Sequence, residues 1–250
     1  MNIIGIIPAR FGSSRFEGKP LIDIQGMSMI QRVYLQCKKA KSLSQVVVAT
    51  DDQRIFAHVE DFGGTVILTS PLHASGTERC NEVLSILKQT STTSIDGVLN
   101  IQGDEPFINP TQIDELAKLL HNPDVHIATL IKKITDKTEL FNSNVVKVVF
   151  NQFSQALYFS RSPIPHLRGV DQNNWLLEGS FFKHIGIYAY RSSVLESIVK
   201  IEPSNLEKAE SLEQLRWLSN GYKIDVAETD SESIAIDTPE DLIRVLKAYF

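Results

Sequence analysis

The chain has 250 residues, of which 42% are hydrophobic and 22% charged, and its formal net charge is −5. This length and hydrophobic content predict one domain with a sizeable core. The acidic balance argues against a general binder of nucleic acid or of membrane surfaces, because both partners attract a basic face. We expect a soluble, cytoplasmic protein, because no stretch is apolar enough to span a bilayer and no basic leader precedes the first predicted strand. The two cysteines, Cys37 and Cys80, lack the spacing of a metal or redox motif, which predicts buried thiols in a reducing compartment.

The first 120 residues alternate between predicted strands and predicted helices. Apolar runs predict strands at 2–8, 45–50, 65–68 and 96–102. Helices are predicted at 27–41, from Asp51-Asp52 to about 63, at 76–88 and at 110–120. Alternation of this kind predicts an α/β fold, with a mostly parallel sheet covered by helices.

The middle of the chain is rich in predicted strands. They lie at 126–133, 144–150, 155–160 and 183–190, with a hairpin expected between 150 and 155. Residues 161–180 contain two prolines and many polar residues, which predicts an irregular loop. One helix at 206–220, a strand at 222–228 and a last helix from Pro239 return the chain to α/β order. An excursion of this kind often carries a substrate pocket, a dimer interface or both.

A glycine-rich basic loop, residues 8–20, follows the first predicted strand. Its cations are Arg10, Arg15 and Lys19. In open α/β sheets, ligands bind at the carboxyl ends of strands, and cations beside flexible glycines suit several phosphate oxygens at once. The loop is not a P-loop, because five residues separate its glycines and proline follows the lysine. It therefore indicates polyphosphate binding, and the alternative is a basic surface turn.

Two acidic segments follow later strands. In Gly103-Asp104-Glu105-Pro106, the Asp104 carboxylate suits Mg²⁺, although the same residues suit an ordinary turn. In the segment that begins at Asp237, Thr238 is predicted to cap a helix, with Pro239 at its first position and Asp241 completing a capping box. Capping does not explain Asp237, which could support the cap or bind a metal. Together with a phosphate loop, the two aspartates favour phosphoryl-transfer chemistry with magnesium.

Other polar groups are less specific. Small polar residues at 73–79 could offer backbone groups to a base or phosphate, or could form a plain helix cap with an exposed Arg79. Strand alternation places His184, Gly186 and Tyr188 on one face, where they could line a polar pocket, although a structural histidine is the common outcome. Glu213 and Gln214 on a helix are typical of a solvated face.

A set of motifs in order along nearly the whole chain, from 6 to about 242, resembles one enzyme family. The motifs are PAR-x-x-S-x-R-x-x-GKPL, A-T-D-D, SGTER, N-x-QGDEP, NVVKVV, ALYFSR, H-x-GIY-x-YR, LEQLR and DTPEDL. They resemble bacterial 3-deoxy-manno-octulosonate cytidylyltransferase, the CMP-Kdo synthetase. The N-terminal motifs are shared with other sugar nucleotidyltransferases, including CMP-sialic acid synthetases, whereas ALYFSR, H-x-GIY and LEQLR are more specific. One departure is Glu17, where the family pattern has proline, and it adds a negative charge and flexibility to the loop.

The resemblance implies a Rossmann-like, three-layer nucleotide-diphospho-sugar transferase fold, with a mostly parallel mixed sheet and a β-rich excursion. It implies a single nucleotidyltransferase domain, 1–250, in which about 1–125 and 222–250 bind CTP and about 126–221 bind the sugar and dimerise. It also implies cytidylyl transfer from CTP to 3-deoxy-D-manno-octulosonate (Kdo) for lipopolysaccharide synthesis, with Mg²⁺ as cofactor and a homodimer as assembly.

The same resemblance implies roles for particular residues. Catalysis would use Arg15, Lys19, Asp104 and Asp237, and the last two would bind the metal. The nucleotide would contact Ala9, Arg10, Arg15, Lys19, Ser75, Gly76, Arg79 and Gln102. The sugar acid would contact Arg161, His184, Tyr188, Glu213 and Gln214.

Two other functions stay open at this point. One is the same chemistry on another acid sugar, such as a sialic acid or the 8-amino analogue of Kdo. The other is a catalytically silent nucleotide-binding protein that keeps the fold. The presence of both acidic residues and all three cations argues against the silent alternative.

Overall fold

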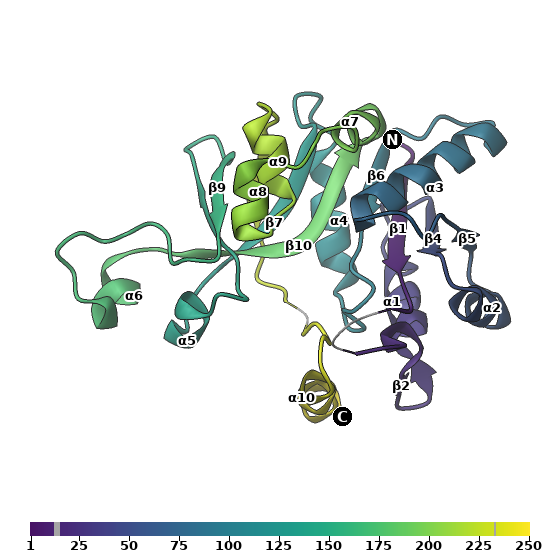
Figure 1. Cartoon of the computed structure of the whole chain (residues 1–250), viewed down its shortest axis with the longest axis horizontal. Coiled ribbons are helices and arrows are strands. Elements are labelled where there is room, and N and C mark those ends of the chain that lie inside the picture. Colours follow the sequence, from purple (N-terminus) through teal and green to yellow (C-terminus); the bar gives the residue numbers. More distant parts are fainter. Residues whose placement is uncertain (13–15, 233) are drawn as a thin grey trace.

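The computed structural model describes residues 1–12, 16–232 and 234–250 (Figure 1). Arg15 therefore lies outside the described residues. The strands are β1 (Ile3–Ala9), β2 (Asp23–Ile24), β3 (Met27–Ser28), β4 (Gln45–Thr50), β5 (Val66–Leu68), β6 (Gly97–Asn100), β7 (Ile127–Lys133), β8 (Lys147–Phe150), β9 (Ala156–Ser160), β10 (Phe182–Arg191) and β11 (Ile224–Glu228). The helices are α1 (Met29–Cys37), α2 (Gln53–Asp61), α3 (Gly76–Thr90), α4 (Pro110–Leu119), α5 (Lys137–Phe141), α6 (Trp175–Glu178), α7 (Ser192–Ile198), α8 (Asn205–Glu210), α9 (Gln214–Ser219) and α10 (Pro239–Tyr249), with short 3₁₀ helices at Lys19–Leu21 and Gln172–Asn174.

The central sheet has the strand order β11-β7-β10-β6-β1-β4-β5. The strand β1 lies in its parallel part, hydrogen-bonded to β4 on one side and β6 on the other. In this register Ile6 is level with both Val47 and Asn100, so the segments that follow β1 and β6 leave the same edge of the sheet. The predicted mostly parallel sheet with helices on its faces is confirmed.

The strand β10 introduces the antiparallel part. It lies between β6 and β7 and is antiparallel to both, while β11 adds to β7 in parallel. The predicted hairpin is present as the antiparallel pair β8–β9, and β8 also pairs with β10. In Figure 1 the segments that carry β9, α5 and α6 extend away from β1 and β4.

The two faces of the sheet pack into separate clusters. Along β10, Ile185 and Ile187 belong to one cluster, and Tyr188 and Tyr190 to the other. This alternation confirms that His184 shares a face with Tyr188, and their ring centroids are 5.2 Å apart. Burying branched aliphatic side chains on both faces is what a mostly parallel sheet requires.

A smaller cluster fastens the C-terminal helix beside the first loop. Val245 of α10 is fully buried and packs with Ile24, Met29 and Ile236. The rings of Phe107 and Tyr249 add a stacked pair with centroids 4.0 Å apart. The helix therefore holds the segment before it, which carries Asp237, against the end of the sheet.

Helix starts follow the local sequence as predicted. The Asp52 side chain accepts a hydrogen bond from the Arg54 amide at the start of α2. The side chain of Thr238 caps α10 in a capping box with Asp241. These short-range hydrogen bonds satisfy amides that the first helical turn cannot pair.

The prediction of one helix over 206–220 is wrong. The chain forms α8 and α9 instead, because Ser211 adopts a left-handed conformation with φ of 52°. Its carbonyl accepts a hydrogen bond from the Arg161 guanidinium. Two further helices, α5 and α7, were also not predicted, and the predicted irregular loop over 161–180 contains the short helix α6.

Candidate active site

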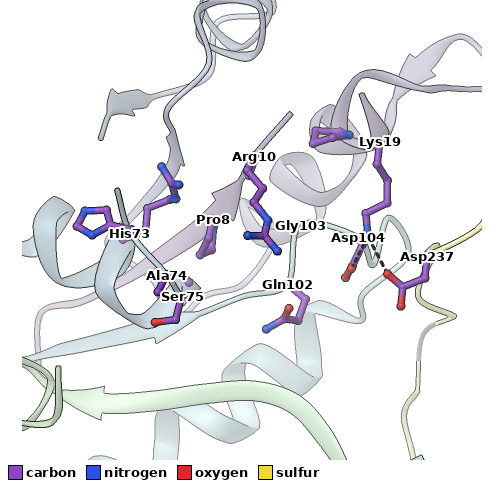
Figure 2. Close-up of a pocket in the computed structure, with 14 residues that line it drawn as sticks. Pro8, Arg10, Lys19, His73, Ala74, Ser75, Gln102, Gly103, Asp104 and Asp237 are labelled. Atoms are coloured by element: carbon purple, nitrogen blue, oxygen red, sulfur yellow. Dashed lines mark hydrogen bonds and ion pairs between the residues drawn. The ribbon is translucent and has the colours of Figure 1, made fainter. Parts of the chain in front are cut away.

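A cavity of about 360 Å³ opens where β1 and β6 end and α3 begins. Most of the residues predicted to bind nucleotide line it, namely Ala9, Arg10, Lys19, Ser75, Gly76, Arg79 and Gln102. Both predicted metal ligands, Asp104 and Asp237, line it as well. Figure 2 shows His73 to Ser75 at one end of the cavity and Lys19 with the two aspartates at the other, with Arg10 and Gln102 between them.

The aspartates converge on one cation. Lys19 Nζ lies 2.8 Å from Asp104 Oδ2 and 3.0 Å from Asp237 Oδ1 (Figure 2). The Ile236 amide donates to the Asp104 carbonyl over 2.9 Å, which holds the C-terminal segment beside the end of β6. Burial opposes the charge on Lys19, but the two carboxylates outweigh it and raise the pKa of the lysine.

The donor set at this end suits magnesium. Among the described residues there is no group of three or more acidic, histidine or cysteine side chains that could hold a metal. Two carboxylates that already converge on one positive charge fit Mg²⁺, because this ion keeps several waters and is bound by one or two carboxylates together with substrate phosphates. The capping of α10 is provided by Thr238 and Asp241, so the Asp237 carboxylate is not needed for the cap.

Close backbone approaches shape the cavity floor. A Cβ atom on Gly103 would lie 2.8 Å from the Pro8 carbonyl oxygen, so only glycine fits where the segment after β6 passes the end of β1. Gly18 has a φ of 69° and precedes the turn that carries Lys19. Its amide donates to the Phe11 carbonyl over 3.0 Å, which closes the described ends of the basic loop.

The start of α3 forms the other end. The Ser75 side chain accepts from the Glu78 amide and caps the helix. The alternative of an exposed Arg79 is wrong, because this side chain is buried. Its guanidinium donates to Thr69 Oγ1 over 2.5 Å and lies 3.3 Å from Asp51 Oδ2, so its position in the cavity wall is fixed.

A second cavity, of about 990 Å³, lies beside the antiparallel strands. Arg161, Lys183 and His184 line it, and so does Asp237, which therefore faces both cavities. Gln102 lines the first cavity and its amide donates to the Gly186 carbonyl over 2.7 Å, where β10 borders the second. The two cavities thus meet near the aspartate pair.

The sequence left two roles open for His184, a structural histidine and a pocket residue, and the structure shows features of both. Its Nε2 lies 3.0 Å from Thr129 Oγ1, as in a satisfied structural histidine, and it also lines the second cavity. Burial lowers its pKa to about 3, so the imidazole is neutral at ordinary pH.

Arg161 borders the same cavity but is engaged by backbone. Its guanidinium donates to the carbonyls of Glu210, Ser143 and Ser211. The Glu210 carboxylate in turn accepts from the Arg161 amide over 2.9 Å and from Ser160 Oγ over 2.6 Å. Arg161 therefore fixes the corner between α8 and α9 and has only part of its donors left for a ligand.

Three predicted sugar contacts, Tyr188, Glu213 and Gln214, line neither of these two cavities. Tyr188 and Gln214 are buried, and Glu213 Oε2 accepts from Thr77 Oγ1 over 2.6 Å. Burial raises the pKa of Glu213. The solvated-face prediction is therefore wrong for Gln214, which is buried, and Glu213 is half-buried beneath the start of α3.

Sequence reasoning missed two buried lysines beside the second cavity. Lys147 Nζ donates to the carbonyls of Asn142, Val145 and Arg161, and Lys183 Nζ lies 2.6 Å from Glu139 and Glu232. The signal was present in the sequence, since both lysines interrupt apolar strand runs, and a charge in such a run needs a partner.

Comparisons with known proteins show which family this chain resembles. The family described as Cytidylyltransferase matches residues 4–224. A protein of Cytophaga hutchinsonii named 3-deoxy-manno-octulosonate cytidylyltransferase is 54% identical over 98% of this chain and 96% of its own length. A protein of the same name from Parabacteroides distasonis is 51% identical over 98% of this chain and 97% of its own length.

Solved structures are similar to this chain as well. CMP:2-keto-3-deoxy-manno-octonic acid synthetase complexed with CTP is 39% identical, with a TM-score of 0.89 over 99% of this chain and 98% of that one. A glucose-1-phosphate thymidylyltransferase described as putative, from Bacillus anthracis, is 17% identical, with a TM-score of 0.66 over 98% of this chain and 94% of that one. At this identity the match shows the shared fold alone. In the described part of the chain, no helix combines the length and apolarity needed to cross a membrane. The chain belongs to the 3-deoxy-manno-octulosonate cytidylyltransferase family.

Proposed function

We propose that this protein transfers the cytidylyl group of CTP to Kdo and releases CMP-Kdo and pyrophosphate. The names of its relatives and the CTP complex of a similar structure support this reaction. The single observation that carries it is the position of Asp104 and Asp237, which converge on Lys19 where a cavity lined by nucleotide-binding motifs meets a larger one. A reaction that joins two substrates needs its catalytic groups at such a junction.

The first cavity holds CTP. Arg10, Arg15 and Lys19 bind the triphosphate, for which several cations in one loop are suited. The cytidine lies at the opposite end and contacts Ala9, Ser75, Gly76, Arg79 and Gln102. Support comes from the cavity itself, where all these residues except Arg15 line one wall or another. Arg15 is assigned from its motif alone.

The second cavity holds the sugar acid. Arg161 and His184 line it, together with Lys132, Lys183 and Arg244, each of which already pairs with an acidic side chain. Neutral His184 can exchange hydrogen bonds with sugar hydroxyls without adding charge. Tyr188, Glu213 and Gln214 are assigned to the sugar from their motifs alone, since they line neither of the two cavities.

The reaction is an in-line attack of the 2-hydroxyl of Kdo on the α-phosphorus, with pyrophosphate leaving. Asp104 and Asp237 would hold Mg²⁺, which would lower the pKa of the attacking hydroxyl and neutralise charge on the phosphates. Lys19 and Arg15 add donors to the same oxygens. The protein otherwise positions the two substrates, which is most of what phosphoryl transfer asks of an enzyme.

Location and assembly belong to the same proposal. The protein works in the cytoplasm, where CTP is available, and it forms a homodimer through the β-rich middle. Three large apolar side chains of this part of the chain are exposed: Phe153 is 70% exposed, Leu157 60% and Leu177 83%. Exposed apolar side chains of this size favour an interaction surface.

Pyrophosphate release is the direct test. Purified protein is incubated with CTP and Mg²⁺, with and without Kdo, and with ATP, GTP and UTP as controls. We expect release that requires both CTP and Kdo. Release with 8-amino-Kdo or a sialic acid in place of Kdo keeps the mechanism and changes the substrate. Silence with every acid sugar contradicts the proposal.

A further inference from the structure

The loop from Ser70 to Ser75 forms one end of the nucleotide cavity, yet little apolar packing holds it. Pro71 and Ala74 are exposed, and Leu72 is 90% exposed. His73, Ala74 and Ser75 line the cavity (Figure 2). Because a loop without buried side chains gains little from packing, its position must come from polar contacts.

Two glutamates on one face of α3 provide these contacts. Glu78 Oε2 accepts from the Ala74 amide over 2.8 Å. One turn further, Glu82 Oε2 accepts from the Ser70 amide over 2.8 Å and lies 2.5 Å from His73 Nε2. Residues four apart share a helix face, so the two carboxylates hold both ends of the loop against the same helix.

The loop is fastened from the strand side as well. Arg79, between the two glutamates in sequence, bonds to Thr69 Oγ1, next to Ser70. The Thr69 amide donates to the Thr50 carbonyl over 2.8 Å. The end of β5 and the start of α3 are therefore fixed, and Glu78 and Glu82 together hold the segment between them, Glu82 through Ser70 and His73.

We infer that Glu82 is a positioning residue for nucleotide-base selection. By fixing Ser70 and His73, it holds the backbone groups of 73–75 in the arrangement that meets the edge of the base. Cytosine and uracil differ in the donor and acceptor pattern of that edge, and a rigid site rejects the wrong pattern because buried polar groups are left unpaired. A loosened loop can adjust to either base. This inference rests on the proposed function, which places the base at this end.

The test compares Glu82→Ala, Glu82→Gln and the wild-type protein. Loss of a hydrogen-bonded carboxylate should raise the KM for CTP about tenfold and lower the preference for CTP over UTP about tenfold. The value of kcat should change less than about threefold, because the loop lies away from Lys19 and the aspartates. Loosening the loop weakens binding of the substrate and of the transition state equally. Glu82→Gln keeps an acceptor oxygen for the Ser70 amide and should restore most of both values.

Glu196→Ala is the matched control. Helix α3 also carries Lys88, whose Nζ lies 2.6 Å from Glu196 Oε1 of α7. This ion pair is far from the loop in sequence. Its removal deletes a glutamate contact to α3 without touching residues 70–75, and we expect wild-type kinetics. His73→Ala, which removes only one of the two contacts of Glu82, should show a smaller loss of selectivity than Glu82→Ala.

Two outcomes overturn the inference. One is a folded Glu82→Ala protein with wild-type KM for CTP and wild-type preference over UTP. The other is a parallel rise in the KM for Kdo with a lowered melting temperature, which indicates a general structural role. Calorimetry keeps this test separate from the proposed function. It measures the binding of CTP alone, so its result holds even if the acceptor is a different acid sugar.

Discussion

The smaller cavity is lined largely by turns that directly follow β1 and β6 and precede α3, whereas the larger one is lined by side chains from α5, β7, β10 and the C-terminal segment. In the first, neighbouring strands and close backbone contacts bring the walls together. In the second, charged side chains that are far apart in sequence must meet. Removing one side chain from the first cavity should therefore remove only the contacts of that side chain. Removing one charged side chain from the second cavity should disturb several neighbouring contacts.

The largest effect is expected at the junction of the two cavities. Asp104→Asn or Asp237→Asn should lower kcat about a thousandfold or more, since a carboxylate-held metal supplies several kcal/mol to the transition state. The melting temperature should change little, because both side chains are partly exposed. Pyrophosphate release and thermal melting measure the two quantities, with exposed Asp124→Asn as control. Near-normal turnover in either variant at ordinary magnesium excludes the metal assignment.

The next effect tests the network of the larger cavity. Glu210→Ala removes the acceptor of the Arg161 amide and of Ser160, and it should raise the KM for Kdo about tenfold, as expected for two lost hydrogen bonds. The KM for CTP should stay within about twofold of wild type. Steady-state kinetics with each substrate varied in turn measures this, with exposed Glu202→Ala as control. Equal rises in both KM values mean that the two cavities are not independent.

A smaller effect concerns pH and stability. Burial lowers the pKa of His184 to about 3, below its unfolded value, so the neutral form stabilises the fold above about pH 6.5. This contribution is lost as pH falls from 6.5 towards 3, by about 2 kcal/mol between pH 6.5 and 5. His184→Gln should flatten the dependence of the unfolding free energy over that range by this amount. Denaturant titrations at several pH values measure it, and an unchanged slope contradicts the burial argument.

The smallest effect is expected from the thiols of the parallel part. Cys37 and Cys80 are fully buried, and burial raises the pKa of both. Neutral, inaccessible thiols react poorly, so a maleimide should leave activity unchanged while it labels the denatured chain. Mass spectrometry after timed labelling measures this. Rapid labelling of the native protein would mean that the parallel part opens more readily than its packing indicates.

The sequence predicted the features that short stretches encode. The caps at Asp52 and Thr238 and the strand 45–50 depend on neighbouring residues, and they are as expected. The strand β10 and the strands of the β8–β9 hairpin were also predicted, because alternation is local.

Other features depend on distant partners. The Ser211 carbonyl, at the break between α8 and α9, is hydrogen-bonded to Arg161, 50 residues away, and Glu213 is hydrogen-bonded to Thr77, 136 residues away. No pattern within the helix itself could show either. The roles assigned to site residues stay predictions, although Asp104 and Asp237 do lie together as the motifs indicated.

The hydrogen bond from Ile236 to Asp104 joins one of the last segments of the chain to the centre of the sheet. A ribosome completes every strand of that sheet before it adds Asp237. A nascent or prematurely ended chain that stops short of Asp237 can thus pair all its strands yet lacks one of the two carboxylates. Activity would then report that synthesis has passed this point, whereas strand pairing would not.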